Sequence, residues 1–424
     1  MIKIRAGTVL VAAFISFLTI PALWAGEVAG FKFDFGSGPA AAGWTKVLPS
    51  TIYSRDWGHG FEPGASLSAV EREGNNFYFN DFVTSARPFL FSVALPEGNY
   101  RVTVMLGDAA GASTNTIKAE SRRLMLENVV TAPGKFATRS FTVNIRTARI
   151  SGGGAVKLKE RERDYLHWDD KLTLEFNGAR PCVAALEITP ATNAVTVYLA
   201  GDSTVTDQPR EPWNSWGQML PRFFSADVAV ANHAESGESF KSSIGAHRFD
   251  KIFSTIKPGD YLFMQFGHND MKDKAADALA SYKLNLERCV EQARKAGATP
   301  VLVTSMERKG GVDRDTLGDY PKTVRDVARA KNVALIDLHA MSKVLYRALG
   351  TNLSQAFQDG THHNNYGSYE LARCVVEGIK ANQLPLAKLL ATDGAAFDPA
   401  HPDPLDQFKM PPSPQRDATK PDGN

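Results

Sequence analysis

Cysteine is scarce in this chain. Its 424 residues include only Cys182, Cys289 and Cys374, and no two of these form a C-x-x-C pair. The spacing therefore gives no sign of a zinc site or of a thioredoxin-like redox centre. Cys289 and Cys374 fall in helical patterns of the same predicted domain and could pair in an oxidising compartment, but we favour buried free thiols. We assign no function to any of the three.

A strong charge of one sign and several catalytic motifs are also missing. The net charge is +2, with 22% charged and 43% hydrophobic residues, which are globular values with no electrostatic reason to expect nucleic acid as a partner. No H-E-x-x-H or comparable ligand cluster occurs, which disfavours metal-dependent chemistry. The G-x-S-x-G motif of common α/β-hydrolases is absent too, which weakens a classical lipase assignment.

Long apolar stretches are confined to the start of the chain. Lys3 and Arg5 precede an apolar stretch over residues 8–23, and small residues follow it. The stretch is shorter than a membrane-spanning helix, which needs about 20 residues, and Pro21 interrupts it. We therefore predict a cleaved signal peptide over residues 1–25, no membrane span after its removal, and export to the periplasm or the cell exterior.

Residues 27–192 have the patterning of β-strands. In residues 31–35 and 100–106, apolar side chains alternate with polar ones, and Gly and Pro mark the breaks between such segments. Period-two patterning without a long helical pattern predicts an all-β sandwich. The charged run over residues 157–164 is most simply the solvated end of a hairpin.

From residue 194 the pattern changes to that of an α/β domain. Short apolar runs (residues 195–200, 228–231, 261–266, 300–304 and 334–338) alternate with helical segments, one of which runs from Leu279 to a stop at Gly297. Such alternation predicts a parallel sheet with crossover helices over residues 194–392. Residues 393–424 are rich in Pro and Asp and poor in large apolar residues, so we expect a disordered or loosely docked tail.

Four polar segments follow these runs or precede the last helix. They are GDST (201–204), NHAESG (232–237), GHND (267–270) and DGTH (359–362). In an open α/β sheet, reactive groups collect beyond the carboxyl ends of the strands, so the four segments are expected to converge at one edge. Each alone has a simpler explanation as a helix cap or a turn. Their combination predicts a catalytic site.

Ser203 is the candidate nucleophile of this site. A serine needs a base to take its proton and an acid to hold that base in the right tautomer. Asp359 and His362 are three residues apart, so in a turn the carboxylate can accept from the imidazole Nδ1–H and leave Nε2 facing the serine. A helix starting just after Ser203 would favour a developing anion there. His363 is a neighbouring competitor whose side chain would point differently.

An oxyanion hole is predicted from three donors. They are the backbone N–H groups of Gly237 and Ser203 and the side-chain amide of Asn269. Each well-aimed donor contributes about 3 kcal/mol in the transition state. His268 and Asp270 flank the amide, and we interpret both as supporting residues.

In this order and spacing, the four segments look like the blocks of the SGNH (GDSL-like) hydrolases, whose name lists the Ser, Gly, Asn and His that they share. The resemblance covers residues 195–390 and implies a flavodoxin-like parallel sheet with helices on both faces. More narrowly, GDSTVTD with WGQML, and GHNDMKD, resemble the rhamnogalacturonan acetylesterase branch of carbohydrate esterases. These enzymes remove acetyl groups from pectic rhamnogalacturonan without a metal, so the resemblance implies that no cofactor is needed.

The front domain fits the same resemblance. KFDFGSG (32–38), followed by GWTKVLPSTIYS and WGHGFE, resembles the galactose-binding-like β-sandwich found ahead of such esterase domains. Its aromatic side chains could stack on sugar rings or could be sandwich core and interdomain packing, and the sequence favours neither. These residues are Trp44, Tyr53, Trp57 and Phe61.

The resemblance implies a serine esterase that forms an acetyl-serine intermediate on Ser203 and releases acetate from plant cell-wall polysaccharide. An acetylated polysaccharide or oligosaccharide is the expected partner. A different SGNH activity on lipids or thioesters is the nearest alternative, but it should show an apolar groove at Ser203. The sequence near Ser203 instead offers mixed aromatic and polar side chains, namely Arg210, Glu211, Trp213, Asn214 and Trp216. A non-catalytic carbohydrate-binding protein is the second alternative.

Overall fold

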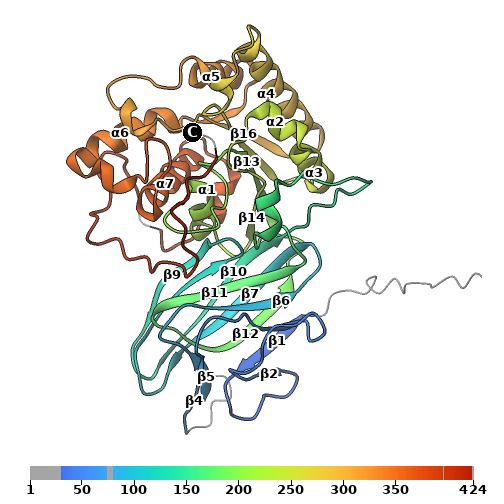
Figure 1. The fold of residues 1–424 in the computed structure, drawn as a ribbon, viewed down its shortest axis with the longest axis vertical. Helices are drawn as coiled ribbons and strands as arrows, with labels where there is room; N and C mark the ends of the chain where they lie inside the picture. The colour runs from blue at the N-terminus through green and yellow to red at the C-terminus, as the bar shows by residue number, and fades with distance from the viewer. Residues whose placement is uncertain (1–29, 74–79, 395, 423–424) are drawn as a thin grey trace, which may run out of the picture.

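The computed structural model describes residues 30–73, 80–394 and 396–422. An all-β part comes first in the chain and a helix-rich α/β part packs on one end of it (Figure 1). The predicted signal peptide, residues 1–25, lies outside the described residues. Within those residues, no helix has the length and apolar character needed to cross a membrane.

The all-β part consists of two facing sheets. Strands β10-β7-β12-β1-β2 form the first sheet, with β5 also paired to β12 and β4 to β5, and strands β3-β6-β11-β8-β9 form the second. Their bounds are β1 (Phe31–Phe35), β2 (Thr45–Val47), β3 (His59–Phe61), β4 (Ser68–Glu71), β5 (Asp81–Thr84), β6 (Phe89–Ala94), β7 (Gly98–Asp108), β8 (Ser113–Ala119), β9 (Arg123–Thr131), β10 (Lys135–Ile145), β11 (Lys171–Arg180) and β12 (Cys182–Pro190). Alternate side chains from both sheets fill the space between them, as the period-two patterning requires.

The aromatic side chains of the front domain fall into two groups. Phe61 is buried in the sandwich core, where its ring contacts Phe35, Phe89 and Phe91. Trp57 is 75% exposed. Core packing therefore explains Phe61 but not Trp57.

The α/β part contains a parallel sheet of order β14-β13-β15-β16-β17. The strands are β13 (Val195–Gly201), β14 (Val228–Asn232), β15 (Tyr261–Gln265), β16 (Thr299–Val303) and β17 (Ala334–Ile336). In chain order this arrangement reads 2-1-3-4-5, the flavodoxin-like order, with its switch point between the first and third strands. The predicted fold class is confirmed.

Helices cover both faces of the parallel sheet. Alternate residues of β13 point to opposite faces: Val197 and Leu199 pack with α1, α6 and α7, and Tyr198 and Ala200 pack with α2, α3, α4 and α5. The helices are α1 (Trp216–Met219), α2 (Phe240–Gly245), α3 (Arg248–Thr255), α4 (Ala278–Lys295), α5 (Tyr320–Lys331), α6 (Leu338–Leu349) and α7 (Asn365–Ala381). Short 3₁₀ turns are η1 (Glu160–Asp164), η2 (Leu220–Phe223), η3 (Asp270–Lys272), η4 (Lys309–Gly311), η5 (Gly350–Ala356) and η6 (Pro385–Leu389).

The three cysteines are free and buried, as predicted. Cys289 lies on the buried face of α4, and Cys374 is a buried residue of α7. Cys182 begins β12. Burial raises the pKa of the Cys289 thiol to about 12, which makes it a poor nucleophile.

A turn of the sandwich inserts into the α/β part. Leu124, next to the β8–β9 turn, is fully buried in the same hydrophobic cluster as β13 and α7. In that turn, Arg122 has a left-handed φ of 64° and its guanidinium contacts Glu211 at 2.7 Å, while Arg123 Nε donates to Asp207 Oδ2 at 2.6 Å. The two parts of the molecule therefore share core and buried ion pairs.

The charged run over residues 157–164 is not a solvated hairpin end, so that interpretation was wrong. It contains η1, and the Glu162 side chain is fully buried with its carboxylate 2.6 Å from Arg248 Nη2. Arg161 Nη2 lies 2.7 Å from the buried Glu235 carboxylate. The charges in this run pair with opposite charges of the α/β part, which one-dimensional patterning does not reveal.

The segment after Asp393 packs against both parts, whereas its composition predicted a disordered or loosely docked tail. Ser413 is buried, and its hydroxyl accepts from Lys118 Nζ at 2.7 Å. Glu211 pairs with the segment through its backbone, donating to Gln415 O at 2.9 Å and accepting from Asp417 N at 2.8 Å. In Figure 1 this segment, in the darkest red, passes across α1. Apolar side chains hold it as well, since Phe397 is buried in the core and Phe408 packs against it.

Candidate active site

Ser203 follows β13 in a tight turn. Gly201 ends the strand, and a Cβ there would lie 2.5 Å from Val205 Cγ2 and 2.8 Å from Gln265 O, so only glycine fits. The Asp202 carboxylate accepts from Thr204 N at 2.9 Å and from Thr204 Oγ1 at 2.7 Å. Residues 202–206 form this turn and α1 begins only at Trp216, so no helix starts just after Ser203. The side chain of Asp202 holds the turn instead.

Ser203, His362 and Asp359 form a continuous hydrogen-bonded chain. Ser203 Oγ lies 2.8 Å from His362 Nε2, and His362 Nδ1 lies 2.8 Å from Asp359 Oδ2. The other carboxylate oxygen, Asp359 Oδ1, accepts from the backbone N–H groups of Thr361 and His362, each at 2.7 Å. The Asp-Gly-Thr-His turn thus fixes the carboxylate against the ring, in the geometry expected from the three-residue spacing.

Electrostatic interactions keep Asp359, the acid of this hydrogen-bonded chain, ionised. Burial alone would raise the pKa of Asp359, but hydrogen bonds from the His362 ring and from two backbone N–H groups hold that pKa below its ordinary value. An ionised Asp359 accepts a hydrogen bond from the Nδ1–H of His362 and stabilises the imidazolium when it forms. Ser203 and His362 are each 1% exposed, so the pair is shielded from bulk water.

Gly237 and Asn269 lie on adjacent loops. Gly237 follows β14 with a φ of 80°, which a side chain would strain, and Asn269 follows β15. Asn269 Nδ2 donates to Glu238 O at 3.0 Å, and its Oδ1 accepts from Lys272 Nζ at 3.0 Å. These bonds set the amide orientation and tie it to the Gly237 loop.

His268 and Asp270 support the turns around Ser203 in different ways. His268 Nδ1 lies 3.4 Å from the fully buried Asp202 carboxylate, and its Nε2 lies 3.0 Å from Met306 O. Burial opposes ionisation of Asp202, but the nearby His268 ring and the hydrogen bonds from Thr204 lower its pKa overall. Asp270 Oδ1 accepts from Phe240 N at 2.8 Å, and burial raises the Asp270 pKa to about 7. Sequence reasoning found both residues but missed the contact between His268 and Asp202.

His363 points away from the serine. Its Nε2 lies 2.9 Å from the Tyr346 hydroxyl, and its ring packs on Phe357 with centroids 4.0 Å apart. Burial lowers the pKa of His363 to about 3, so the ring is neutral in the folded protein. The base of the hydrogen-bonded chain is therefore His362.

The buried His363 predicts a specific pH dependence of stability. Between its folded pKa of about 3 and the ordinary value of 6.5, the unfolded chain binds a proton that the folded protein does not. The free energy of unfolding must therefore fall as pH falls through this window. From pH 6.5 to 4.5, wild type should lose about 2 kcal/mol more than His363→Gln, as measured by urea unfolding. Equal pH dependence of the two proteins would contradict a neutral buried ring.

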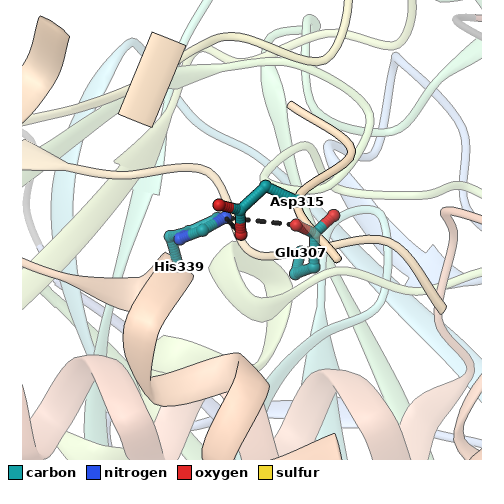
Figure 2. A group of neighbouring side chains, drawn as sticks. All are labelled: Glu307, Asp315 and His339. Atoms are coloured by element: carbon teal, nitrogen blue, oxygen red, sulfur yellow. Dashed lines mark hydrogen bonds and ion pairs between the residues drawn. The ribbon is translucent and has the colours of Figure 1, made fainter. Parts of the chain in front are cut away.

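One group has the spacing of metal ligands within the described part of the chain. Figure 2 shows Glu307 and Asp315 facing His339, whose Nε2 lies 3.2 Å from Glu307 Oε2 and 3.7 Å from Asp315 Oδ1. Lys343 Nζ already contacts Asp315 at 2.7 Å, and Arg325 Nη2 lies 3.2 Å from His339 Nδ1. Lys343 thus places a positive charge on Asp315, whereas the charge of Arg325 is paired with Asp337.

A flavodoxin-like sheet with Ser203, His362 and Asp359 joined at the carboxyl ends of its strands is the arrangement of an SGNH hydrolase. Comparison with known families agrees with this class. Residues 199–368 match the GDSL-like Lipase/Acylhydrolase family, and residues 31–151 match the galactose-binding domain-like family of β-agarase and YXIM esterase-like proteins. The chain belongs to the GDSL-like lipase/acylhydrolase family, and the resemblance inferred from its four motifs is confirmed.

Relatives match either about half of the chain or most of it. The chain is 38% identical over 214 residues to rhamnogalacturonan acetylesterase RhgT of Bacillus subtilis (strain 168), covering 45% of this chain and 92% of that protein. It is 28% identical over 375 residues to the uncharacterized esterase YxiM of the same organism, covering 84% and 92%. The crystal structure of YxiM superposes with a TM-score of 0.45 at 26% identity, covering 84% of this chain and 99% of that one.

Proposed function

We propose that this protein is a serine esterase that removes O-acetyl groups from plant cell-wall polysaccharide, most specifically from pectic rhamnogalacturonan. The observation that carries the proposal is the hydrogen-bonded chain from Ser203 Oγ through His362 to Asp359. The identity to a rhamnogalacturonan acetylesterase supports a carbohydrate acetylesterase. The choice of rhamnogalacturonan among these polysaccharides follows the activity in the name of that relative.

The first half of the reaction acylates the serine. Ser203 Oγ attacks the acetyl carbonyl while His362 Nε2 takes the proton of the serine hydroxyl. Asp359 accepts a hydrogen bond from Nδ1–H and stabilises the imidazolium. The carbonyl oxygen becomes an oxyanion, for which we propose the backbone N–H groups of Ser203 and Gly237 and the Asn269 amide as donors. Collapse of this intermediate expels the sugar oxygen, which His362 protonates as it leaves.

The second half regenerates the enzyme. Water attacks the acetyl-serine carbonyl while His362 Nε2 takes a proton from the water, and the same three donors hold the second oxyanion. Acetate leaves, and the proton returns to Ser203 Oγ. Every proton passes through one nitrogen, so the reaction requires the tautomer that Asp359 imposes.

A cavity beside the catalytic side chains supports a polar substrate. It has a volume of about 290 Å³, and its lining combines Arg161, Gln208, Arg210 and Ser236 with residues 417 and 419–422. A lipid esterase would need an apolar groove here. Of the five side chains expected to form a mixed surface, Arg210 and Trp213 line this cavity. Glu211, Asn214 and Trp216 are buried in hydrogen-bond networks instead.

The proposal extends to processing and organisation of the chain. We propose that residues 1–25 direct export, that residues 27–192 and 194–392 are the two domains, and that the protein acts in the periplasm or outside the cell. β12 ends at Pro190 and β13 begins at Val195, which supports a boundary between them. An acetylated cell-wall polysaccharide lies outside the membrane, which supports export.

A substrate panel tests the proposed function. Acetate release should be most efficient, by kcat/KM, on acetylated rhamnogalacturonan oligosaccharides, lower on acetylated xylan, and lowest on long-chain acyl-nitrophenyl esters. The charged and hydrogen-bonding side chains of Arg161, Gln208 and Arg210 near the site account for this order, because they suit a sugar better than an alkyl chain. The greatest turnover on long acyl chains would identify a lipid esterase. No acetate from any substrate would identify a non-catalytic protein.

A further inference from the structure

Residues 417–422, here called the strap, approach the catalytic site at Asp359 and at the Gly237 loop. Lys420 Nζ is 3.6 Å from the Asp359 carboxylate, and a Cβ placed on Gly237 would lie 3.0 Å from Asp422 Cβ. Ser203 and His362 are each only 1% exposed. The strap therefore occupies space that a polysaccharide must enter to bring its acetyl group to Ser203.

The strap places two carboxylates on two arginines. Asp417 Oδ2 lies 2.9 Å from Arg210 Nη1, and Asp422 pairs with Arg161 through its carboxylate. Both arginines line the cavity beside the catalytic side chains, together with Tyr165 and Trp213. A guanidinium matches a carboxylate in both charge and shape, so the two arginines form a ready receptor for carboxylates.

The strap is attached more weakly than the segment before it. Ser413 is buried, and the backbones of Gln415 and Asp417 pair with Glu211, so the segment is anchored up to the first residue of the strap. In the strap, the side chains of Lys420 and Asp422 are 51% and 60% exposed. Exposed ion pairs contribute little to stability and weaken with salt, so a ligand of the same charge can displace the strap.

We propose that Arg210 and Arg161 bind the carboxylates of uronate units in the substrate, and that Asp417 and Asp422 occupy these two positions when the site is empty of substrate. The ligand is a polysaccharide with acidic sugars beside its acetylated ones. This inference rests on the proposed function and adds a basis for choosing among acetylated polysaccharides, since neutral xylan carries no carboxylate for either arginine.

Arg210 is the better of the two arginines to test. Arg161 also contacts Glu235 at 2.7 Å and donates to Ser236 O at 2.9 Å, so its loss would disturb the loop that carries Gly237. The Arg210 side chain is 53% exposed and reaches outward to Asp417. Arg139, an exposed arginine on β10, provides a matched control of the same charge.

Binding of deacetylated oligosaccharides tests the arginine without depending on turnover. Arg210→Gln should raise the Kd for deacetylated rhamnogalacturonan oligosaccharide about fivefold by titration calorimetry, the effect of one partly exposed charged contact. The Arg139→Gln control should leave this Kd unchanged. The difference should shrink in high salt because the charges are screened. A Kd that is the same in Arg210→Gln and Arg139→Gln would overturn the proposal.

Removing the strap's carboxylates tests the second half of the proposal. Asp417→Asn with Asp422→Asn should lower the Kd for the same oligosaccharide about threefold, because the competing charges are gone. An unchanged or higher Kd would show that the strap does not occupy the carboxylate positions. Failure of the proposed function has a different signature: wild type would release no acetate, whatever the Arg210 variant does to binding.

Discussion

Replacing Ser203 with alanine should lower kcat for acetate release by about five to six orders of magnitude, because removal of a serine nucleophile leaves only the oxyanion donors and substrate binding. His362 then has no hydroxyl 2.8 Å from Nε2 to deprotonate. Acetate released from acetylated rhamnogalacturonan is the measurement. No other single substitution in the site should lower turnover further, because the covalent intermediate itself is lost.

The control for this prediction is Ser281→Ala. Ser281 lies on α4, and its hydroxyl donates to Asp277 at 3.1 Å on the surface. This variant should retain wild-type turnover, and both variants should unfold at the wild-type temperature within a few degrees. If purified Ser203→Ala kept a tenth of wild-type activity, Ser203 would not be the nucleophile.

The largest effect on stability is expected at the contact between the two domains. Arg123→Met should lower the free energy of unfolding by about 3 to 5 kcal/mol, because it leaves the buried Asp207 carboxylate without its ion pair. Arg123 Nε lies 2.6 Å from Asp207 Oδ2, and both side chains are almost completely buried. Urea unfolding, followed by tryptophan fluorescence, measures the loss.

A double variant separates the lost ion pair from lost packing. Arg123→Met with Asp207→Leu removes both charges and should recover most of the stability, since a buried ion pair can be replaced by apolar side chains at little net cost. Arg139→Met, at an exposed position on β10, should change stability by less than about 0.5 kcal/mol. A loss below 1 kcal/mol for Arg123→Met would mean that water reaches Asp207.

Much of the fold follows from local patterns in the sequence. In β7 apolar and polar residues alternate, because only one face of the strand is buried. The short apolar runs at β13 and β15 are buried on both faces. These patterns made the sandwich and the parallel sheet predictable. The contact between Asp359 and His362 was predictable because a turn closes their three-residue separation. Ser203 joins them because strand ends of a parallel sheet share one edge.

Contacts between distant polar residues were not predictable in this way. Arg122 lies in the β8–β9 turn and Arg123 begins β9, and their partners Glu211 and Asp207 are more than 80 residues away. The strap has the same property, since its carboxylates meet arginines from two other loops. The periodicity of apolar residues indicates which side chains are buried, whereas ion pairing depends on which distant segments contact one another in the fold.

The inserted turn of the sandwich limits how this protein can be redesigned. Leu124 belongs to the hydrophobic core beneath the parallel sheet, so the front domain supplies a structural piece of the catalytic domain. An engineered chimera in which a foreign carbohydrate-binding module replaces residues 27–192 would lack that piece and would leave Asp207 with a bare charge. A successful exchange must retain the Arg122–Leu124 tripeptide or redesign the residues of the catalytic domain that contact it.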